Sequence, residues 1–574
     1  MAISLFDASA PLDRAQIEAQ VEDPVLTLPL DKVRLRGFAH GERFHRLDRL
    51  ESYYRRRQDA HKAYDWSGSF FGYGGESPVK PGFWVPYAHR QPAARYDIAR
   101  LAVDRFSALL FGADRFPKIT VAGDEAAQRY VLQLVKATSL VSRLYAARQL
   151  GGAVGSVGMS YGFRDGKPRV EVHNAKHLMP LRWADRAECK LGAVLKCYSY
   201  PRDVYDAKER RIVTTTLYYV RYWDENVEIV WEPMTASQAE DPNWRRFKHD
   251  HVEHGMGVCP VVWIQNRPDA EDPDGEGDYE GTEPNMDELN QLLSGASSGV
   301  KANNDPTLVV KMSPKMNDGS LRKGSGNAIF SEGGAEYLEI SGASAAATLD
   351  TVEKLRAMTL DMLSVVVADP ERLAGAAQSA AALRILYAPM LAATDVLRGT
   401  YGEKIVELLK GLLRGARNLL GQSRIETNEE TGEMTEVRLA VELPPYFEKN
   451  EDGTQTEVAL DPGSSEHIEL NWNPYFAPTW EDISKASASA MAASGGKAVI
   501  SHRTAVQSVQ ELFGVVDVDQ ELEEIAADQQ RAIEQMRESF AVEGGGGPVP
   551  PGTERKPPGD EDEDEDEDAG ADEG

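Results

Sequence analysis

The sequence has few cysteines and no long apolar run. Only three cysteines occur among 574 residues (Cys189, Cys197 and Cys259), too few for a disulfide scaffold and not spaced as a zinc site. The longest apolar runs, such as 363–368, are far shorter than the ~20 residues that a membrane span requires. No basic-then-apolar leader is visible at residues 1–11. We therefore expect a soluble protein, made inside a cell, that does not enter a membrane.

Positive charge is also scarce. Lys and Arg number 63 against 92 Asp and Glu, so the formal net charge is −29. Residues 560–573 alone carry 11 acids and no base, yet the rest of the chain is still acidic. This balance excludes a general nucleic-acid binder with a broad basic face. The 41% of hydrophobic residues excludes wholesale disorder, and the length predicts three or four folded units.

Sequence motifs for catalysis or cofactor binding are missing. No phosphate-binding G-x-x-x-x-G-K-[ST] motif occurs, and the glycine-rich stretch 151–158 follows a helix and precedes a strand, which favours a turn over a dinucleotide site. His249, His251 and His254 surround Glu253 and could in principle hold a metal, but they do not form H-E-x-x-H. Their polar surroundings favour a solvated loop. We expect no catalytic residue, no metal and no cofactor.

The hydrophobic spacing of the first half predicts an α+β unit with a largely antiparallel sheet. Helices are expected over 40–64, 92–111 and 124–150. Strands 157–163 and 167–172 are joined at Asp165-Gly166, a hairpin signal. Further strands are expected at 191–198, 212–223, 227–231 and 258–265. The acidic stretch 267–282, with its prolines and glycines, is interpreted as a solvated connector.

The second half alternates long helices with short strands. Two helices, 283–303 and 347–367, flank a small β segment with strands at 307–311, 328–330 and 337–340. Asp369-Pro370 ends the second helix, and a helix of about forty residues then runs over 380–420 with Pro389 inside it, where a kink is expected. Strands follow within 424–442 and 467–471. Helices fill 479–540, with breaks near Gly495 and Gly514, before a Gly/Pro-rich acidic tail that we expect to be disordered.

Three motifs in this order carry a family resemblance. They are GTEPNMDELN at 281–290, NNDPTLVV at 303–310 and SAAALRILYAPML at 379–391. Their order and spacing resemble the portal proteins of tailed bacteriophages, of the siphophage type, over roughly residues 40–480. In that family the first motif opens a stem helix, the second leaves it for the clip, and the third starts the long wing helix with its proline kink.

The resemblance implies a portal fold with an α/β wing, a two-helix stem, a small β-containing clip, a long kinked helix and an α-helical crown. The implied parts are an N-terminal arm with peripheral wing helices (1–90), the wing (91–282), stem helix 1 (283–304), the clip (305–345), stem helix 2 (346–368), the tunnel loop (369–379), the long kinked helix with return wing strands (380–478), the crown (479–541) and a disordered tail (542–574).

The resemblance also assigns site residues. Tunnel-loop residues next to DNA would be Asp369, Glu371, Arg372, Gln378 and Ser379, with Arg372 the side chain placed to touch it. Clip residues that dock the terminase or an adaptor would be Lys311, Lys315, Arg322 and Lys323. The alternatives are an ordinary loop whose Asp369 or Ser379 caps a helix, and a solvated basic face.

The implied role is a non-enzymatic ring, usually of twelve copies, at one capsid vertex of the virion, assembled in the host cytoplasm. Double-stranded DNA passes through it without sequence-specific contacts. Implied partners are the terminase large subunit, a head-completion or adaptor protein, and the major capsid and scaffold proteins. Two alternatives stay open: another oligomeric phage structural protein, such as a head–tail adaptor or baseplate component, and a hydrolase with an unrecognised site. The acidic tail either repels DNA, binds a basic partner or serves solubility.

Overall fold

The computed structural model describes two compact units, 1–477 and 478–574, each taken here by itself. The described residues are 42–58, 64–65, 90–92, 94–112, 115–164, 166–206, 211–304, 307–310, 335–338, 342–367, 380–427, 434–438, 441–449, 455–476, 480–494, 500–513, 515 and 518–543. Within them the chain is a mixture of helices and an antiparallel sheet, so the α+β class is confirmed.

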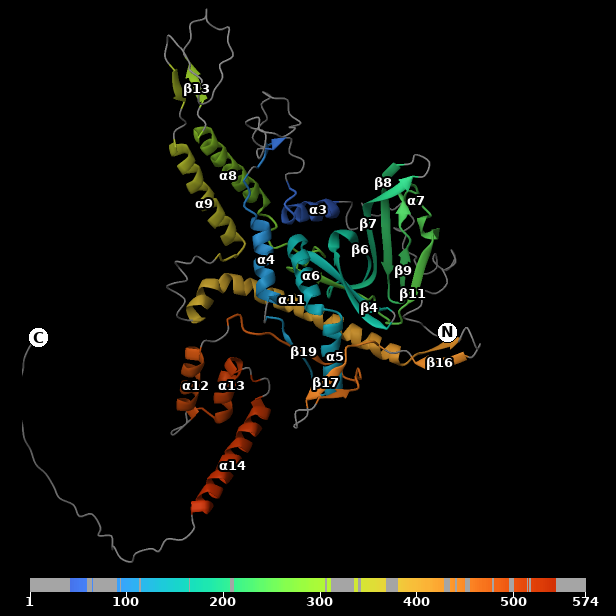
Figure 1. Ribbon diagram of the computed structural model, residues 1–574, viewed down its shortest axis with the longest axis vertical. Helices are drawn as coiled ribbons and strands as arrows, with labels where there is room; N and C mark the ends of the chain where they lie inside the picture. Colours follow the sequence, from blue (N-terminus) through green and yellow to red (C-terminus); the bar gives the residue numbers. More distant parts are fainter. Residues whose placement is uncertain are drawn as a thin grey trace, which may run out of the picture. The chain divides into compact units, whose positions relative to one another are not determined.

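A large antiparallel sheet dominates the first unit (Figure 1). Its hydrogen-bonded order is β11-β9-β8-β7-β12-β4-β5, with β6 paired to β7 and β10 to β8. The strands are β4 (Ser156–Arg164), β5 (Lys167–Asn174), β6 (Leu178–Asp185), β7 (Lys190–Asp206), β8 (Arg211–Trp223), β9 (Val227–Trp231), β10 (Met234–Thr235), β11 (His249–Glu253) and β12 (Val261–Gln265). The hairpin predicted around Asp165-Gly166 is confirmed as β4–β5, whereas β6, β10 and β11 were not predicted.

Helices cover this sheet at one end. They are α3 (Glu42–Tyr54), α4 (Ile98–Phe111), α5 (Glu125–Ala137) and α6 (Leu140–Val154), with the short α7 (Ala236–Ala239) and the 3₁₀ turns η3 (Ala175–His177) and η4 (Trp244–Arg246) elsewhere. Helix α6 packs on β4 and β5. The predicted end of a helix at Gly112 is confirmed. At Gly155, φ is +93° where α6 turns into β4, which confirms the predicted helix-to-strand turn.

The single helix predicted over 124–150 is wrong, because the chain forms two helices there. Thr138 ends α5 by donating its backbone N–H to Leu134, and Ser139 adopts a left-handed conformation with φ 51° before α6 begins. Apolar residues continue at helical spacing across this break, so periodicity alone does not reveal it.

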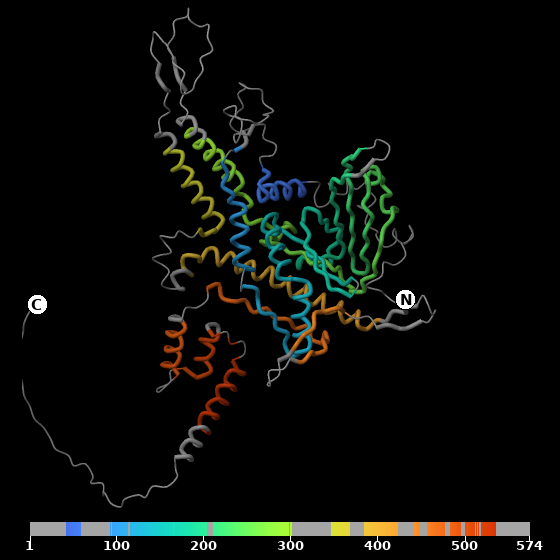
Figure 2. Tube along the Cα trace, in the orientation of Figure 1, coloured from blue at the N-terminus to red at the C-terminus, as the bar shows by residue number. Residues whose placement is uncertain are grey.

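Two helices of the first unit form a pair that carries a small strand pair at one end. They are α8 (Glu283–Asn304) and α9 (Gly342–Met362), which lie side by side in Figures 1 and 2. Strand β13 (Thr307–Val310) follows α8 and pairs antiparallel with β14 (Ala335–Leu338), which precedes α9. Both helices and two of the three predicted strands are thus confirmed, although α9 begins and ends about five residues earlier than expected. The strand expected at 328–330 lies outside the described residues.

Helix α11 (Ala380–Leu420) is 41 residues long, as predicted, and contains Pro389. It packs against β12, β4 and α4, and so crosses the sheet-bearing region (Figure 2). Short strand pairs complete the unit: β1 (Tyr64–Asp65) with β2 (Arg90–Gln91), β15 (Ser423–Thr427) with β16 (Met434–Arg438), β17 (Tyr446–Lys449) with β18 (Gln455–Val458), and β19 (Ile468–Asn471) with β3 (Lys118–Val121).

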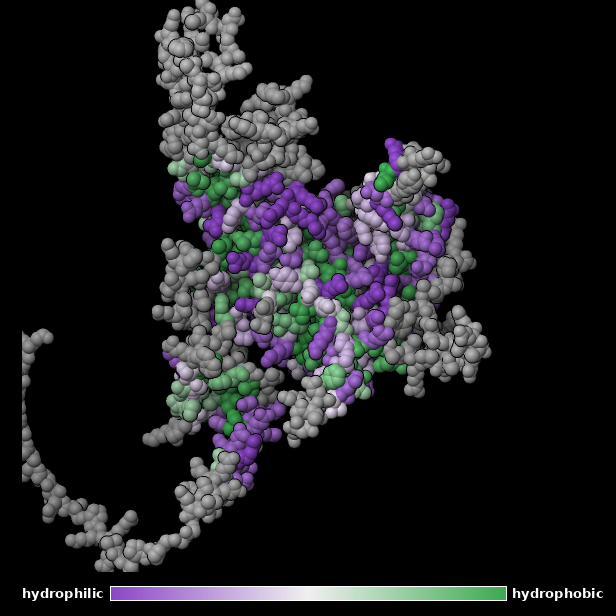
Figure 3. All heavy atoms as spheres, viewed as in Figure 1, coloured by the Kyte–Doolittle hydropathy of each residue, from purple (hydrophilic) through white to green (hydrophobic). Residues whose placement is uncertain are grey.

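The main hydrophobic core of the unit joins α3, α4, α5, α6, α8, α9 and α11 to strands β4 and β12. A second cluster gathers buried residues of β6, β7, β8, β9 and β10 and includes Trp231 of β9 and Trp244 of η4. Hydrophilic residues predominate on much of the face shown in Figure 3, with apolar patches among them. Because α8 and α9 both contribute residues to the main core, the base of their pair is part of that core.

The described residues of the second unit form the helices α12 (Trp480–Ser494), α13 (His502–Phe513) and α14 (Val518–Glu543). Helix α13 packs against both α12 and α14. The predicted breaks near Gly495 and Gly514 fall between these helices. Residues 544–574, including the acidic run, lie outside the described residues, and their expected disorder stays a prediction.

Candidate functional site at the base of the helical pair

The acidic stretch that leads into α8 is buried. Asp274 and Asp278 are each 1% exposed, and Tyr279 is fully buried. The predicted solvated connector is therefore wrong for this part of 267–282. Arginines from α3 and α6, more than a hundred residues earlier in the chain, pair with these carboxylates, and no local sequence pattern signals that pairing.

Arg148 of α6 and Asp278 form an ion pair in which both side chains are fully buried. Arg148 Nη2 donates to Asp278 Oδ1 at 3.0 Å and to Oδ2 at 2.9 Å. The Nδ2 of Asn266 donates to the same Oδ1 at 3.0 Å, and the Tyr401 hydroxyl of α11 donates to Asn266 Oδ1 at 3.4 Å. A buried charge is tolerated only when it is paired and hydrogen-bonded, and this network meets that condition for the carboxylate.

The packing around this pair requires glycine at position 152. A Cβ atom there would lie 2.2 Å from Arg148 Nη1 and 2.4 Å from Asp278 Oδ2. The Gly152 carbonyl also accepts a hydrogen bond from the Asp278 backbone N–H at 2.8 Å. The guanidinium of Arg148 lies over the rings of Phe106 and Tyr401 at 6.0 and 5.8 Å. Helices α4, α6 and α11 and the acidic stretch therefore meet at one buried point.

One face of α3 binds the same acidic stretch at a second point. Arg43 donates through Nε and Nη2 to the two oxygens of Asp274, at 2.5 and 2.8 Å. Its other donations go to the carbonyls of Leu178 and Ala175 at 3.1 and 3.0 Å. Ser156 Oγ also donates to Asp274, at 2.6 Å. The bidentate Arg–carboxylate geometry fixes α3 against the sheet as well as against the connector.

Further along this face of α3, Arg46 donates to Glu280 through Nε and Nη2 at 2.6 and 2.9 Å, and it also pairs with Asp272. The hydrogen bond to Glu280 is the main cause that raises the pKa of Arg46 above its ordinary value, against the opposing effect of burial. Tyr53 then donates to Asp287 Oδ2 in α8 at 2.9 Å. Positions 43, 46 and 53 recur at helical spacing, so one face of α3 binds the stretch from its start to the first turns of α8.

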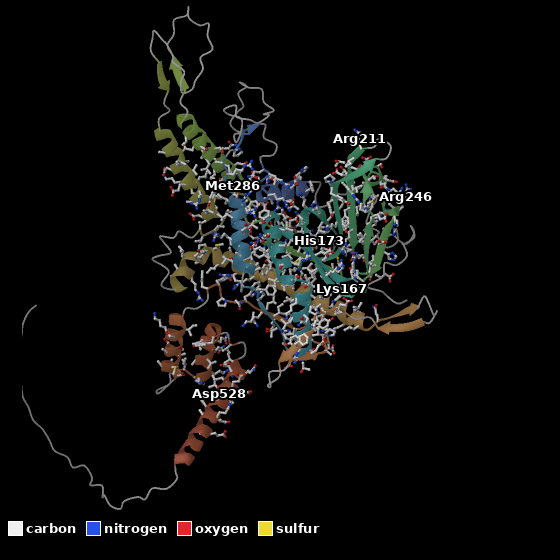
Figure 4. The ribbon with its side chains drawn as sticks, in the orientation of Figure 1. Lys167, His173, Arg211, Arg246, Met286 and Asp528 are labelled. Atoms are coloured by element: carbon white, nitrogen blue, oxygen red, sulfur yellow. The ribbon has the colours of Figure 1, made fainter. Side chains whose placement is uncertain are left out.

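The segment 94–96 holds both members of the helical pair. The Tyr96 backbone N–H donates to Asn290 Oδ1 of α8 at 2.8 Å, and the Ala94 N–H donates to Ser294 Oγ at 3.0 Å. From α9, Arg356 Nε donates to the Tyr96 hydroxyl at 2.9 Å and its guanidinium lies over that ring. Met286, labelled in Figure 4, is buried at the same base. Both helices are thus bound to the segment that enters α4.

The histidines near residue 250 are not in a solvated loop, so that expectation is wrong. His249 and His251 lie on β11, and His249, His251 and His254 are each 4–5% exposed. His254 Nε2–H donates to the Asp224 carbonyl at 3.0 Å, while its Nδ1 accepts from the Met256 N–H at 3.3 Å. Burial lowers the pKa of His254. These contacts make His254 a structural neutral histidine, and no group of three or more possible metal ligands gathers in the described part of the chain.

A serine–histidine–lysine row on the sheet, in which Ser160 and His173 are buried and Lys196 is half-buried, was not anticipated from sequence. Ser160 Oγ and His173 Nε2 are 2.7 Å apart, and Lys196 Nζ lies 2.9 Å from His173 Nδ1 (His173 is labelled in Figure 4). An ammonium only donates, so Nδ1 accepts and the Nε2–H donates to Ser160. Burial lowers the pKa of Lys196 to about 8 and also lowers the pKa of His173. His173 in this tautomer has no free lone pair to accept a proton from Ser160.

Most of the site residues assigned by resemblance lie outside the described residues. Only Pro389 is described, as an internal residue of α11. The residues outside are Lys311, Lys315, Arg322, Lys323, Asp369, Glu371, Arg372, Gln378 and Ser379. Their roles stay predictions. What sequence reasoning missed is the buried ion-pair site. Acids are dense just before α8 and arginines are dense in α3, but neither density shows that the two stretches pair.

Comparison with known proteins assigns the chain to a family. No helix among the described residues is long and apolar enough to cross a membrane. A search of curated proteins returned no match. The family model described as phage portal protein, SPP1 Gp6-like, matches residues 39–424, more than half of the chain and the whole region that contains α3, the sheet, α8, α9 and α11. The chain therefore belongs to the SPP1 Gp6-like family of phage portal proteins.

Proposed function

We propose that this chain assembles as a ring, of twelve copies as is usual for the family, around an axial channel at one capsid vertex. Double-stranded DNA is packaged through the channel by the terminase and later leaves through it, and head-completion or adaptor proteins attach to the ring. The family assignment gives the general portal role, a structural rather than enzymatic one in the virion. We propose the channel, the copy number and the named partners beyond that general role.

The helical pair is proposed as the stem, with β13 and β14 at the root of the clip. Support comes from the order of elements, since α8 leaves the sheet region, the strands pair at its far end, and α9 returns. The sheet-bearing part is then the wing, α11 the long wing helix, with Pro389 as its kink, and α12–α14 the crown. The tunnel loop would occupy 369–379, directly before α11.

The buried ion pairs are the observation that best supports a mechanical role. A stem that lines a channel must keep its angle to the wing while DNA and the motor exert force on it. Arg148–Asp278 and Arg43–Asp274 bind the segment just before α8 to α3, α6 and the sheet, and Arg356 binds α9 to Tyr96. Each link has a buried or half-buried partner, so solvent screens it less than a surface pair.

Exposed apolar side chains on the helices support assembly with further copies. Met358 and Met362 of α9 are 62% and 61% exposed, and Ile385 of α11 is 78% exposed. Large apolar side chains that stay exposed in one chain favour burial against another. Packing of neighbouring copies along α9 and α11 would remove them from water.

The acidity of the chain suits a channel for a polyanion. Each Lys or Arg contact to phosphate strengthens DNA binding and makes it more salt-dependent, so a channel that lets DNA slide benefits from few such contacts. With a net charge of −29 per chain, a ring is strongly anionic. Arg372 in the proposed tunnel loop would be an isolated exception, and Lys311, Lys315, Arg322 and Lys323 would face protein partners at the clip.

Electron microscopy of the purified full-length protein, together with light scattering after size exclusion, tests the proposal. The expected result is a closed ring of about twelve chains with a central opening. A stable monomer, or an oligomer without an opening, would contradict the proposed DNA channel. The family assignment does not depend on this result.

A further inference from the structure

Strand β5 forms an edge of the large sheet and borders a hollow. Among the described strands β5 pairs only with β4, which leaves its other edge without a strand partner. A hollow of about 580 Å³ runs along this edge, between β5 and the turn that joins α5 to α6. The residues of the hollow that carry the argument are Arg143, Lys167, Arg169, Val170, Glu442 and Pro444.

Alternate backbone groups of β5 point away from β4, to the side of the strand that has no strand partner among the described strands. Tyr161 of β4 donates its N–H to the Pro260 carbonyl, on the side away from β5. Val170 is directly opposite Tyr161, so its own N–H and C=O point away from β4, and the same alternation applies to Val172, opposite Met159. Within the described chain these groups of Val170 and Val172 have no hydrogen-bond partner. They are free to pair with another strand.

One such main-chain bond already exists at the start of this edge. The backbone N–H of Glu442 donates to the Gly166 carbonyl at 2.7 Å, next to the first residue of β5. The chain at Glu442 therefore shows that a polypeptide segment can lie within hydrogen-bonding distance of this edge. Val170, further along this edge, lines the hollow. Val172 follows it at the same edge and has no strand partner on that side among the described strands.

The side chains around the hollow are mostly cationic. Lys167 and Arg169 are exposed and occupy alternate positions of β5, about 6.8 Å apart, the spacing of alternate side chains in any extended strand. Arg143 is exposed in the first turn of α6, across the hollow. Neither Arg143 nor Arg169 has an ion-pair partner among the described residues, whereas Glu171 is bound to Arg221 at 2.7 Å. Lys167 pairs with the exposed Glu442 at 3.4 Å (Figure 4 labels Lys167).

We propose that the β5 edge binds an extended acidic segment of a partner protein, which adds to the sheet as a further strand. Its main chain pairs with Val170 and Val172, and carboxylates at alternate positions meet Lys167, Arg169 and Arg143. Main-chain pairing gives affinity in this binding mode, and the alternate side chains give specificity. Nucleic acid offers phosphates to the cations but no strand to the backbone, so the free edge favours a polypeptide over DNA.

Fluorescence anisotropy on the full-length protein tests this site with two labelled peptides of equal charge. The probe is Glu-Val-Glu-Thr-Glu-Val-Glu, and the control is Glu-Pro-Glu-Thr-Glu-Pro-Glu, whose prolines cannot donate to a ladder. The probe is expected to bind at least about tenfold more tightly than the control, and binding is expected to weaken as salt increases. Equal binding of both peptides would overturn strand addition.

Charge reversal locates the interaction. Lys167→Glu with Arg169→Glu is expected to weaken probe binding by about tenfold or more, an effect of about 1.4 kcal/mol. The matched control is Arg202→Glu, which reverses an exposed arginine on β7 of the same sheet and is expected to leave binding unchanged. All three side chains are exposed, so the variants are expected to fold, as circular dichroism would verify. An equal loss in Arg202→Glu, or binding of a twelve-base-pair duplex in place of the peptide, would overturn the proposal.

Discussion

Arg148 and Asp278 are 130 residues apart in the sequence, and in the structure they form an ion pair with no exposed surface on either side chain. The pair joins α6 to the segment that enters α8, and Tyr401 of α11 reaches it through Asn266. The elements proposed as wing, stem and long helix are therefore coupled at one buried point. Its removal is the most direct way to test whether that point holds the unit together.

Asp278→Ala is expected to lower the free energy of unfolding by about 3–5 kcal/mol, because it leaves the buried Arg148 guanidinium without its carboxylate. Arg148→Met combined with Asp278→Leu is expected to cost less than the two single changes added together, since neither charge is then left unpaired. Urea unfolding of the full-length protein measures both.

The control for this prediction is Asp350→Ala, which removes the exposed pair of Asp350 with Lys354 in α9. Its expected cost is much smaller than that of Asp278→Ala, because solvent screens exposed pairs within a helix. If Asp278→Ala lowers the free energy of unfolding by no more than Asp350→Ala does, the structural role assigned to the buried pair is contradicted.

Gly152→Ala is expected to destabilise the protein by about 1–3 kcal/mol, because the added methyl group would overlap Arg148 Nη1 and Asp278 Oδ2. Gly299→Ala in α8 is the matched change, since a Cβ there meets nothing within 4 Å. That control is expected to be neutral or to stabilise by up to about 1 kcal/mol, the helix preference for alanine. Thermal or urea unfolding that ranks the two variants in the opposite order would contradict the packing described here.

Stability is expected to fall as the pH drops below about 6.5, the ordinary pKa of histidine. Burial lowers the pKa of His254 and of His173 in the folded state, so the unfolded chain binds their protons first and acid favours unfolding. His254→Gln keeps one hydrogen-bond donor and one acceptor. It is expected to reduce the loss of stability between pH 6.5 and 5. His467→Gln, at an exposed position, is the control and is expected to leave the slope unchanged. Equal slopes in wild type and His254→Gln would refute this assignment.

Deletion of residues 375–379 is expected to leave ring assembly intact but to impair DNA packaging, because these residues belong to the proposed tunnel loop. Light scattering measures assembly, and nuclease protection of packaged DNA measures the second effect. The control replaces the five residues by a Gly/Ser segment of the same length. Normal packaging by the deletion variant would rule out the loop assignment.

Reversal of Lys311, Lys315 and Lys323 to Glu is expected to weaken docking of the terminase or the adaptor protein while the chain stays folded. Opposite charges at an interface steer association, so reversal lowers the association rate most strongly at low salt. Pull-down and surface plasmon resonance measure docking. The same reversal at the exposed Lys118 and Lys136 is the control. Loss of folded protein in the triple variant would instead indicate that these lysines make structural contacts.

Much of the element order could be predicted because it depends on local patterns. Helix α11 and the hairpin of β4 and β5 follow from apolar spacing and a two-residue turn, and both are confirmed. The break at Ser139 and the burial of His249 on β11 were missed. Continuous periodicity conceals a left-handed residue, and the polar composition of 249–253 does not reveal that histidines of this strand are buried.

The order of the helices and of most strands, the acidic balance and the family resemblance can be inferred from the sequence alone, because propensity, spacing and motif order are properties of neighbouring residues. Which charges are buried together depends instead on how distant elements pack. Whether Asp274 and Asp278 face water or an arginine depends on α3 and α6, which fold from distant parts of the chain. Burial of a carboxylate becomes tolerable only once such a partner is in place, and no local stretch of sequence contains both halves of that pair.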